Sequence, residues 1–256
     1  MLIGIIGGSG FYKLADFESA KKEIIKTPFG DVELFFGKIE GKNVVFLPRH
    51  KEGHRIPPHM INYRANIYAL YEVGVDYIIS TNAVGSMRKE LQPGKIVFPD
   101  QIIDLTKNRT YTFFDGEFEI KLRNGKIKKG VVHTDVTEPY CNELRKIFIE
   151  VAQDLNLDFA EKGVYVCAEG PRFETPAEIN FFKIIGGDIV GMTSSPEVFL
   201  AKELEICYAT ICVVTNYAAG MQERVSHEEV IKIFNKVSPK IFNIICETVV
   251  RLSERR

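Results

Sequence analysis

Tryptophan is absent from this 256-residue sequence, and cysteine is scarce, with only five residues. The cysteines are odd in number, dispersed and never spaced as C-x-x-C; they are Cys141, Cys167, Cys207, Cys212 and Cys246. A zinc site is therefore not expected, and the pattern predicts reduced thiols in a cytoplasmic protein.

An excess of charge and long apolar runs are also missing. The 33 Lys+Arg and 34 Asp+Glu leave a formal net charge of −1, which disfavours nucleic acid or an acidic membrane surface as a partner. No apolar run approaches the roughly 18 residues of a membrane span. The start, Met1-Leu2-Ile3-Gly4, lacks the basic region of a signal peptide.

What is present is a regular alternation of short apolar runs with segments of helical periodicity. Strands are expected over residues 2–6, 33–39, 43–48, 75–81, 96–105, 163–168, 188–192 and 207–216. Helices are expected over 60–71, 138–155, 177–185 and 196–204, and from 228 onward with an interruption or kink at Pro239. A polar excursion with one exposed hairpin is expected over 107–129. We predict one α/β domain over residues 1–256, with a mixed, mostly parallel sheet covered by helices on both faces.

Small, hydroxylic and charged residues follow several of these strands. They occur in Gly7-Gly8-Ser9-Gly10, in Arg49-His50 with His54 nearby, and in segments 80–86, 168–175, 191–197 and 213–220. The glycine segment is not a dinucleotide fingerprint, because Lys13 stands where the third glycine would fall, and no G-K-[ST] follows to make a P-loop. Each segment alone could be an ordinary turn. Together, at the carboxyl edge of one sheet, they predict a single pocket that can bind an anion.

Two of these segments lead into helices with strong start signals. Thr175-Pro176-Ala177-Glu178 combines a capping threonine, a first-turn proline and a glutamate three residues on, and Ser226-His227-Glu228-Glu229 repeats the capping pattern. Glu174 thus directly precedes a helix N-terminus, where a carboxylate is favoured and can accept hydrogen bonds from a ligand.

The same segments resemble a known family, the trimeric purine nucleoside phosphorylases together with the 5′-methylthioadenosine phosphorylases. The matching stretches are Gly7-Gly8-Ser9-Gly10, Arg49-His50, Thr81-Asn82-Ala83-Val84-Gly85-Ser86, Glu169-Gly170-Pro171-Arg172-Phe173-Glu174-Thr175, Met192-Thr193-Ser194-Ser195-Pro196-Glu197 and Thr215-Asn216. They run in order from residue 4 to beyond 227 and cover nearly the whole chain. The resemblance implies the nucleoside phosphorylase fold, with a distorted, barrel-like sheet flanked by helices, and a homotrimer or a dimer of trimers.

The resemblance also implies roles for individual residues. A phosphate site would comprise Ser9, Arg49, His50, His54, Asn82, Ala83 and Thr193. A nucleoside site would comprise Phe173, Glu174 and Asn216 at the purine, with Tyr217 and Ala218 beside them, and Met192 under the ribose. Asn216, Glu174 and His50 would act in catalysis.

Two of these positions indicate which purine is bound. A 6-oxopurine carries a proton on N1 that a carboxylate accepts, whereas a 6-aminopurine presents an acceptor there. Members that cleave adenine nucleosides carry a small residue in place of Glu174 and aspartates in place of Asn216 and Ala218. Since a mismatched base would leave buried polar groups unpaired, hypoxanthine or guanine is the expected leaving base.

The 5′ substituent of the nucleoside stays open. His227 matches the histidine that hydrogen-bonds a 5′-hydroxyl in inosine-cleaving members. The stretch 100–139, however, resembles the methylthioadenosine branch, in which the residue matching His133 reaches a neighbouring subunit's 5′ pocket. Inosine, guanosine and 5′-methylthioinosine are therefore all candidate substrates.

The reaction implied is phosphorolysis of the N-glycosidic bond in purine salvage, through an oxocarbenium-like state. Orthophosphate is the attacking co-substrate, so neither a metal nor another cofactor is expected. Three alternatives are a 5′-methylthioadenosine phosphorylase, a nucleosidase that uses water, and a nucleoside-binding protein without turnover.

Overall fold

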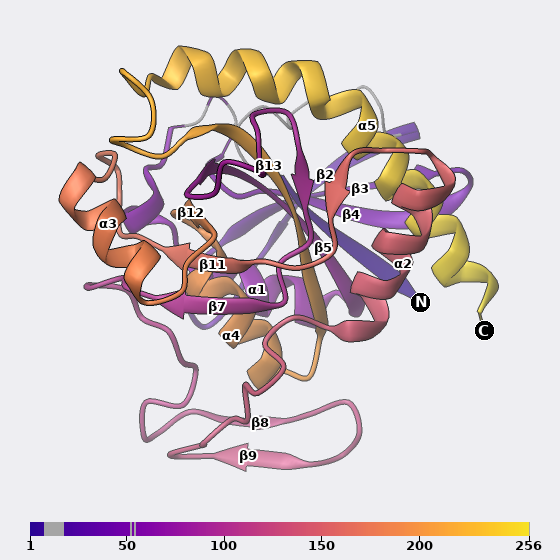
Figure 1. Cartoon of the computed structure of the whole chain (residues 1–256). Coiled ribbons are helices and arrows are strands. Elements are labelled where there is room, and N and C mark those ends of the chain that lie inside the picture. The colour runs from indigo at the N-terminus through magenta and orange to yellow at the C-terminus, as the bar shows by residue number, and fades with distance from the viewer. Residues whose placement is uncertain (8–17, 52, 54, 256) are drawn as a thin grey trace.

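The structure is a computed structural model that describes residues 1–7, 18–51, 53 and 55–255 (Figure 1). Its strands are β1 (Leu2–Gly7), β2 (Glu18–Ile25), β3 (Val32–Ile39), β4 (Lys42–Pro48), β5 (Val75–Ser86), β6 (Ile96–Val97), β7 (Gln101–Asp104), β8 (Glu119–Lys121), β9 (Ile127–Lys129), β10 (Phe159–Ala160), β11 (Val164–Cys167), β12 (Ile189–Gly191) and β13 (Cys207–Tyr217). The helices are α1 (Tyr63–Glu72), α2 (Asn142–Asp154), α3 (Pro176–Ile184), α4 (Ser194–Glu203) and α5 (His227–Glu254), with a 3-10 turn over Pro58–Met60. Two residues of the predicted phosphate site, Ser9 and His54, lie outside the described part of the chain.

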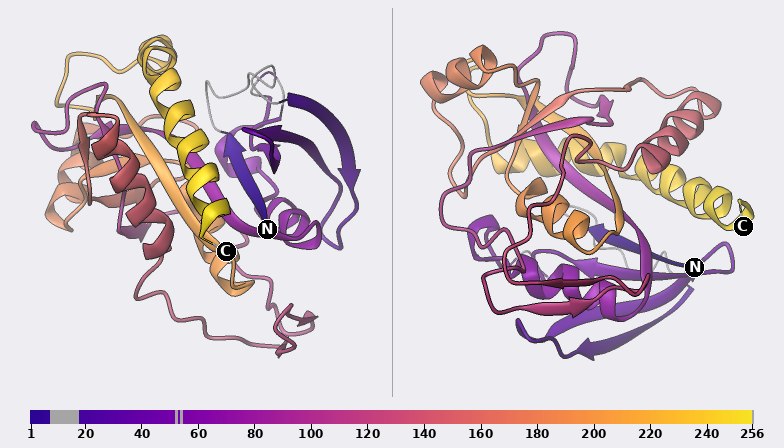
Figure 2. Two further views of the ribbon diagram at one scale, coloured as in Figure 1. Left: turned by 90° about the vertical axis from the view of Figure 1, so that its right-hand side faces the viewer. Right: turned by 90° about the horizontal axis from the view of Figure 1, so that it is seen from below.

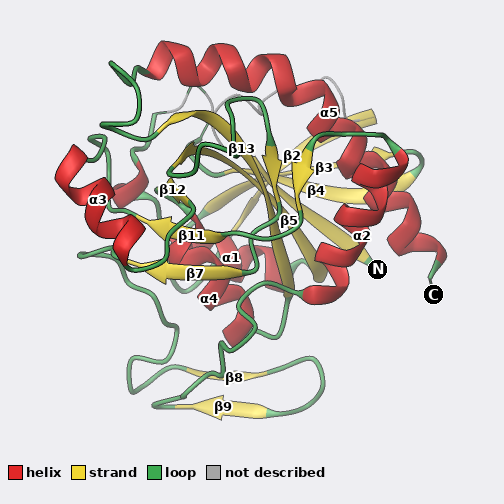
Figure 3. Cartoon of the chain, in the orientation of Figure 1, coloured by secondary structure: helices red, strands yellow, loops and turns green. Residues whose placement is uncertain are grey.

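Eleven of the described strands form one sheet, whose main path runs in the order β10-β6-β13-β5-β1-β4-β3-β2. Strand β1 pairs in parallel with β4 and β5, and β5 pairs in parallel with β13. Strand β5 also pairs in antiparallel with β12, from which the sheet continues through β11 to β7. The sheet therefore forks at β5, and the predicted mixed, mostly parallel architecture is confirmed (Figure 3).

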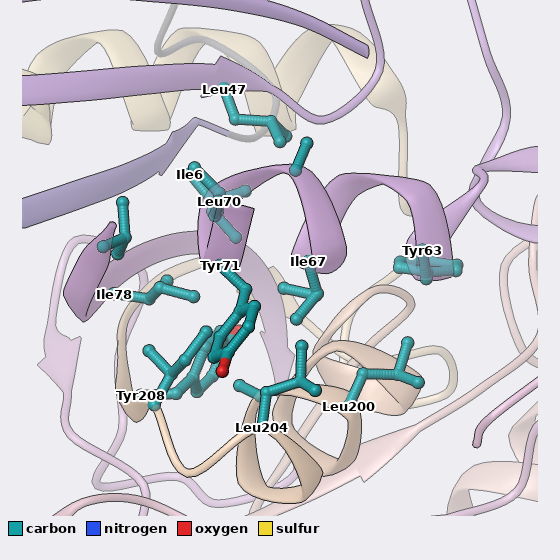
Figure 4. Close-up of a cluster of buried hydrophobic side chains, with 14 of the residues drawn as sticks. Ile6, Leu47, Tyr63, Ile67, Leu70, Tyr71, Ile78, Leu200, Leu204 and Tyr208 are labelled. Atoms are coloured by element: carbon teal, nitrogen blue, oxygen red, sulfur yellow. The ribbon is translucent and has the colours of Figure 1, made fainter. Parts of the chain in front are cut away.

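Helices cover both faces of this sheet because side chains alternate along its strands. Ile5 and Phe46 pack with α2 and α5 in one buried cluster. Their neighbours Ile6 and Leu47 point the other way and pack with α1 and α4. Figure 4 shows this second cluster, with Leu204, which directly follows α4, facing the side chains of α1. Each one-residue step along a strand thus switches the side chain from one helical layer to the other.

The polar excursion between β7 and α2 carries the β8–β9 hairpin, which extends away from the sheet (Figure 2). It is less exposed than expected, because Phe113, Ile120 and Leu122 are buried in the α1/α4 cluster. The Glu203 carboxylate of α4 also accepts hydrogen bonds from Thr112 Oγ1, at 2.6 Å, and from the Phe113 amide, at 2.8 Å. The excursion is therefore anchored to the helical layer.

Three strands differ from expectation. Segment 80–86 was expected as a loop but is the second half of β5, because pairing with β13 continues to Ser86 and overrides the turn preference of its small residues. The expected strand 96–105 is two short strands, β6 and β7, separated around Pro99, which has no amide hydrogen for a ladder. Strand β2 was not expected. It is a lysine-bearing strand that pairs only with β3 among the described strands and so lies at the sheet edge.

The terminal helix α5 continues through Pro239 over 28 residues, so the proline does not interrupt it. The helix changes direction along its course in Figure 1, which is the kink expected where a proline removes one backbone hydrogen bond. Within the described residues, no helix is both long and apolar enough to cross a membrane.

The prediction of reduced thiols is wrong for two of the five cysteines. Cys141 and Cys207 form a disulfide, with Cα atoms 5.2 Å apart and a separation of 66 positions in the sequence. The Cys141 amide donates to the Tyr208 carbonyl, at 2.8 Å, and this contact brings the start of α2 to the start of β13. Such a long-range approach leaves no spacing signature. The carboxylate of Glu143 lies near both sulfurs, but none of these three residues lines the cavity described below.

Candidate active site

A cavity of about 410 Å³ lies where the second half of β5, the end of β12 and the end of β13 meet. It gathers most of the residues that the sequence places in a site: Arg49, His50, Asn82, Ala83, Phe173, Glu174, Met192, Thr193, Asn216, Ala218 and His227. These residues come from segments up to 178 positions apart (227 − 49). The strand ends therefore form one pocket, as the pattern of loops predicts.

Arg49 lines the cavity, and its guanidinium already makes several hydrogen bonds within the protein. Its Nε and Nη2 donate to the two carboxylate oxygens of Glu197, both at 2.7 Å. Nη2 also donates to Ser80 Oγ at 2.6 Å, and Nη1 donates to the Thr81 carbonyl at 3.1 Å. Neither Arg49 nor Glu197 has exposed side-chain surface. Burial alone would lower the pKa of Arg49, but the ion pair with Glu197 outweighs it and raises the pKa.

This geometry changes the role expected of Arg49. A planar guanidinium suits a bidentate contact with phosphate, but that of Arg49 makes its bidentate contact with Glu197 instead. Of its five N–H groups, four are used in the bonds above, and the second N–H on Nη1 has no partner among the described residues. An anion beside Arg49 would therefore need other donors as well.

Asn82 and Thr193 provide a second polar unit beside Arg49. Thr193 Oγ1 donates to Asn82 Oδ1 at 2.5 Å, and Asn82 Nδ2 donates to Thr210 Oγ1 at 2.6 Å. Asn82 and Thr193 are buried. Because each amide atom of Asn82 has a partner, the side chain is held in one orientation at the cavity wall.

His50 is fixed by a backbone contact. Its Nδ1 lies 2.7 Å from the Ile56 carbonyl oxygen, and a carbonyl can only accept, so the proton is assigned to Nδ1. The ring is 3% exposed. His50 is thereby oriented where it lines the same cavity as Arg49.

Glu174 and Phe173 line the same cavity and lie immediately before α3. The predicted capping box of α3 is present: Glu178 N donates to Thr175 Oγ1 at 3.1 Å, and Thr175 N donates to Glu178 Oε2 at 2.7 Å. Glu174 is partly buried, and desolvation raises the pKa of its carboxyl. A partly desolvated carboxylate can accept a hydrogen bond strongly.

Asn216 reaches the cavity through an irregularity in β13. The register of β13 against β5 shifts between Val214 and Asn216, and such a bulge redirects a side chain. Thr215 Oγ1 donates to Asn216 Oδ1 at 2.8 Å, and Asn216 Nδ2 donates to the Tyr217 carbonyl at 2.8 Å. A Cβ on the facing Gly85 would lie 3.2 Å from Asn216 Nδ2, so the glycine makes room for the amide.

Met192 contributes an apolar side chain to the lining of the cavity. It packs against Gly170, which has a φ of +67°, and a Cβ there would lie 2.6 Å from Met192 Sδ. Any other residue at position 170 would be strained in backbone conformation and would displace Met192. The segment that contains Gly170 and the segment that contains Met192 therefore lie so close together that only glycine fits at position 170.

Of the predicted site residues that the structure describes, two do not line this cavity. Tyr217 turns away, and its hydroxyl donates to the Lys89 carbonyl at 3.0 Å. His133 is exposed on the excursion and is not part of this chain's own pocket. The Ser226 cap of α5 is present, since Glu229 N donates to Ser226 Oγ at 3.1 Å, and it places His227 at the cavity rim.

The buried residues that hold Arg49 in position were not predicted from the sequence. Glu197, Ser80 and Tyr208 form the buried network around Arg49, with Tyr208 OH donating to Glu197 Oε2 at 2.8 Å. One signal was available: Glu197 interrupts an otherwise apolar helical segment, 196–201, and a glutamate there is rarely buried without a cationic partner. The wall formed by Arg55, Pro57 and Pro58 carried no such signal.

The fold and the site together define a class of protein: an α/β enzyme with a cavity at the strand ends of a forked, mixed sheet, lined by a buried arginine and histidine together with a carboxylate and an amide. The chain belongs to the phosphorylase superfamily, whose family model matches residues 2–250.

Relatives and solved structures agree with this membership. The chain is 51% identical, over 99% of its length and 94% of the relative's, to the 6-oxopurine nucleoside phosphorylase of Pyrococcus furiosus. It is 46% identical to the S-methyl-5′-thioadenosine phosphorylase of Saccharolobus solfataricus, over 99% and 90% of the two chains. A solved methylthioadenosine phosphorylase from Schistosoma mansoni, in complex with adenine, superposes with a TM-score of 0.90 at 34% identity, covering 99% of this chain and 92% of that one.

Proposed function

We propose that this protein catalyses the phosphorolysis of 6-oxopurine nucleosides, releasing the free base and a ribose 1-phosphate in purine salvage. One observation carries the proposal. The partly buried Glu174 carboxylate and the Asn216 amide line the same cavity as Arg49 and His50. A carboxylate at the base end accepts the N1 proton of hypoxanthine or guanine and has no such partner in adenine.

In the proposed mechanism, orthophosphate binds at the end formed by Arg49, His50, Asn82, Ala83 and Thr193. Arg49 contributes its remaining N–H and its charge, and its buried pair with Glu197 keeps its position fixed. Phosphate attacks C1′ as the bond to the base lengthens, and the sugar passes through an oxocarbenium-like state. Because phosphate itself is the nucleophile, no covalent enzyme intermediate and no metal or other cofactor is required.

At the other end, Asn216 stabilises the charge that develops on the purine at N7, and Glu174 fixes the ring. Both groups are held before the reaction starts, Asn216 by Thr215 and Tyr217 and Glu174 by the capped start of α3. This is electrostatic preorganisation directed at the leaving group. Phe173 and Ala218 enclose the base, and Met192 packs under the ribose.

The 5′ group is the finer part of the proposal. His227 at the cavity rim favours a 5′-hydroxyl, and hence inosine or guanosine. 5′-Methylthioinosine stays a second candidate, because His133 is exposed on the excursion and matches the residue that reaches a neighbouring subunit's pocket in the methylthioadenosine branch; this would require a homotrimer or a dimer of trimers. A 5′-methylthioadenosine phosphorylase is disfavoured by Glu174, whose carboxylate would face the N1 acceptor of adenine.

We also propose that residues 1–256 form a single phosphorylase domain that acts in the cytoplasm, with no nucleic-acid or membrane partner. The Cys141–Cys207 disulfide sets a condition on that compartment, because structural disulfides are rare in the cytosol except in proteins of hyperthermophilic archaea and bacteria.

The test compares inosine, guanosine, 5′-methylthioinosine, adenosine and 5′-methylthioadenosine, each with and without orthophosphate, by following free base. We expect release of hypoxanthine and guanine that requires phosphate, with both adenine nucleosides at least 100-fold poorer in kcat/KM. Base release that continues unchanged without phosphate would identify a nucleosidase instead. Preferred cleavage of 5′-methylthioadenosine would overturn the assignment of Glu174.

A further inference from the structure

Arg109, in the excursion between β7 and α2, is buried beneath the cavity without lining it. Its side chain is 1% exposed. Nη1 donates to the carbonyl oxygens of Met192 and Ser195, both at 2.7 Å. Nη2 donates to the Glu169 carbonyl at 2.6 Å and lies 3.4 Å from the Ala168 carbonyl. One guanidinium therefore bridges the two segments that hold the base and the ribose.

The same guanidinium also contacts a third wall of the cavity. Nη1 donates to the Tyr63 hydroxyl at 3.1 Å, and that hydroxyl donates to the Pro58 carbonyl at 2.9 Å. Arg109 also lies over the Tyr63 ring, 5.4 Å from its centroid. Pro58 lines the cavity and lies close to Gly170. The buried guanidinium of Arg109 therefore connects three segments of the cavity wall, which contain Glu169, Met192 and Pro58.

The chemistry of these contacts suits a rigid connection. Arginine presents its N–H donors in a planar fork, so the acceptors around it are fixed in direction as well as distance. The charge is balanced locally by Glu169, whose Oε2 lies 3.2 Å from Arg109 Nε and accepts from the Lys107 amide at 3.0 Å. Lysine would keep the charge but could not reach both segments with the same geometry.

We propose that Arg109 is a positioning residue for base recognition, setting the distance between the Glu174 segment and Met192. This inference rests on the proposed function, because it assigns Arg109 to discrimination between 6-oxopurines and 6-aminopurines. It predicts that loosening the Arg109 contacts lets Glu174 move away from N1 and narrows that discrimination, even in protein that is completely folded.

The chain offers a matched control. Arg145 in α2 is buried to a similar degree: counting the whole residue, backbone included, Arg145 is 8% exposed and Arg109 is 7% exposed. It too donates to backbone carbonyls, those of Phe98 and Glu161, but none of these residues lines the cavity. Replacing Arg145 removes a buried guanidinium from the core without touching the base or ribose segments.

The experiment uses Arg109→Lys, Arg109→Met, Arg145→Lys and Arg145→Met in the full chain. Calorimetric titration gives the dissociation constants of hypoxanthine and adenine, whose ratio does not depend on the fraction of active protein. We expect Arg109→Lys to reduce the wild-type preference for hypoxanthine about tenfold and to raise the KM of inosine more than it lowers kcat. Arg109→Met should reduce the preference further, so that lysine partly rescues it. Both Arg145 variants should leave the ratio within twofold of wild type.

An unchanged ratio in folded Arg109→Lys would overturn the inference and leave a purely structural role. If both Arg109 variants fail to fold, Tyr63→Phe replaces them, since it removes one acceptor of Arg109 and keeps the ring. A two- to threefold loss of the preference for hypoxanthine is then expected, and an unchanged preference would overturn the inference. Wild-type protein that releases no base from inosine and phosphate would refute the proposed function separately, because the base affinities do not require turnover.

Discussion

Glu174 and Glu197 show how environment separates the roles of two carboxylates near one cavity. Glu197 accepts from Arg49 with both oxygens and from Tyr208, and it has no exposed side-chain surface. The charge of Glu197 is balanced by Arg49 inside the protein, so the role of Glu197 is to hold Arg49 in position. For Glu174, desolvation raises the pKa, and its carboxylate lines the cavity, where a ligand proton can compensate the cost of burial.

At this residue scale, the raised pKa predicts a pH dependence of base binding. Hypoxanthine donates N1–H only to the ionised carboxylate, so its affinity should fall as pH drops through the pKa of Glu174, starting at a higher pH than for an ordinary glutamate. Glu174→Gln should bind hypoxanthine more weakly at neutral pH and without this acid-side dependence. Calorimetric titration at a series of pH values provides the measurement.

The same shift predicts the opposite effect on stability. Because the folded-state pKa of Glu174 is raised, this group favours folding below its unfolded-state pKa, and that contribution is lost as pH rises through the folded-state pKa. Glu174→Gln should therefore raise the Tm of the ligand-free protein at neutral pH but not at acid pH. The exposed Glu90→Gln serves as the control for removing one negative charge, and equal Tm changes in the two variants would contradict the assignment.

At the scale of elements, the start of α3 determines where Phe173 and Glu174 stand. Thr175 and Glu178 cap the helix reciprocally, and Arg172 donates to both oxygens of Glu178, at 2.7 and 2.8 Å. The chain is thus held in place both before and after Phe173 and Glu174 in the sequence. The bulge in β13 does the same for Asn216.

Thr175→Ala should consequently affect both stability and base binding. Loss of the N-cap costs about 1 kcal/mol, which for a chain of this size lowers Tm by roughly 2–4 °C. Hypoxanthine affinity should fall several-fold, because Glu174 loses its support. Ser226→Ala, which removes the cap of α5, should lower Tm similarly and leave hypoxanthine affinity unchanged. Thermal unfolding with base titration tests both variants, and equal affinities in the two would contradict the role given to α3.

At the scale of the whole molecule, long-range connections tie separate layers together. The excursion joins α4 through Glu203 and the cavity walls through Arg109. The disulfide joins the start of α2 to the start of β13, across 66 residues. Neither Cys141 nor Cys207 lines the cavity, so the disulfide stabilises the fold that carries the site without entering the chemistry.

The double variant Cys141→Ser/Cys207→Ser should therefore lose stability but not activity. In the chain-entropy model, opening a loop of this length lowers the free energy of unfolding by about 4 kcal/mol, which corresponds to a fall in Tm of roughly 10 °C. The kcat/KM at moderate temperature should stay within twofold of wild type. A reductant should lower the Tm of the wild type and of Cys246→Ser but not of the double variant. A wild-type Tm that does not respond to reductant would show that the disulfide does not form in solution.

Much of the fold could be predicted from local patterns. Buried strands such as β1 and β13, the turn after β3 and the capping box at Thr175 all depend on neighbouring residues, and the structure confirms them. Predictions failed where distant partners decide. Residues 82–86 carry turn-forming side chains but continue β5 because β13 pairs beside them, and Cys141 meets Cys207 only through the folded chain.

The sequence by itself determined the α/β class, the strand ends that contribute to the cavity and the types of group found there, because periodicity, caps and residue chemistry are local properties. Only the tertiary structure decided how those groups are used. It paired Arg49 with Glu197, turned Asn216 inward through a bulge and placed Arg109 beneath Met192 and Glu169. These contacts join residues from 60 to 148 positions apart, and their geometry depends on sheet register and packing, which exist only once the whole chain has folded.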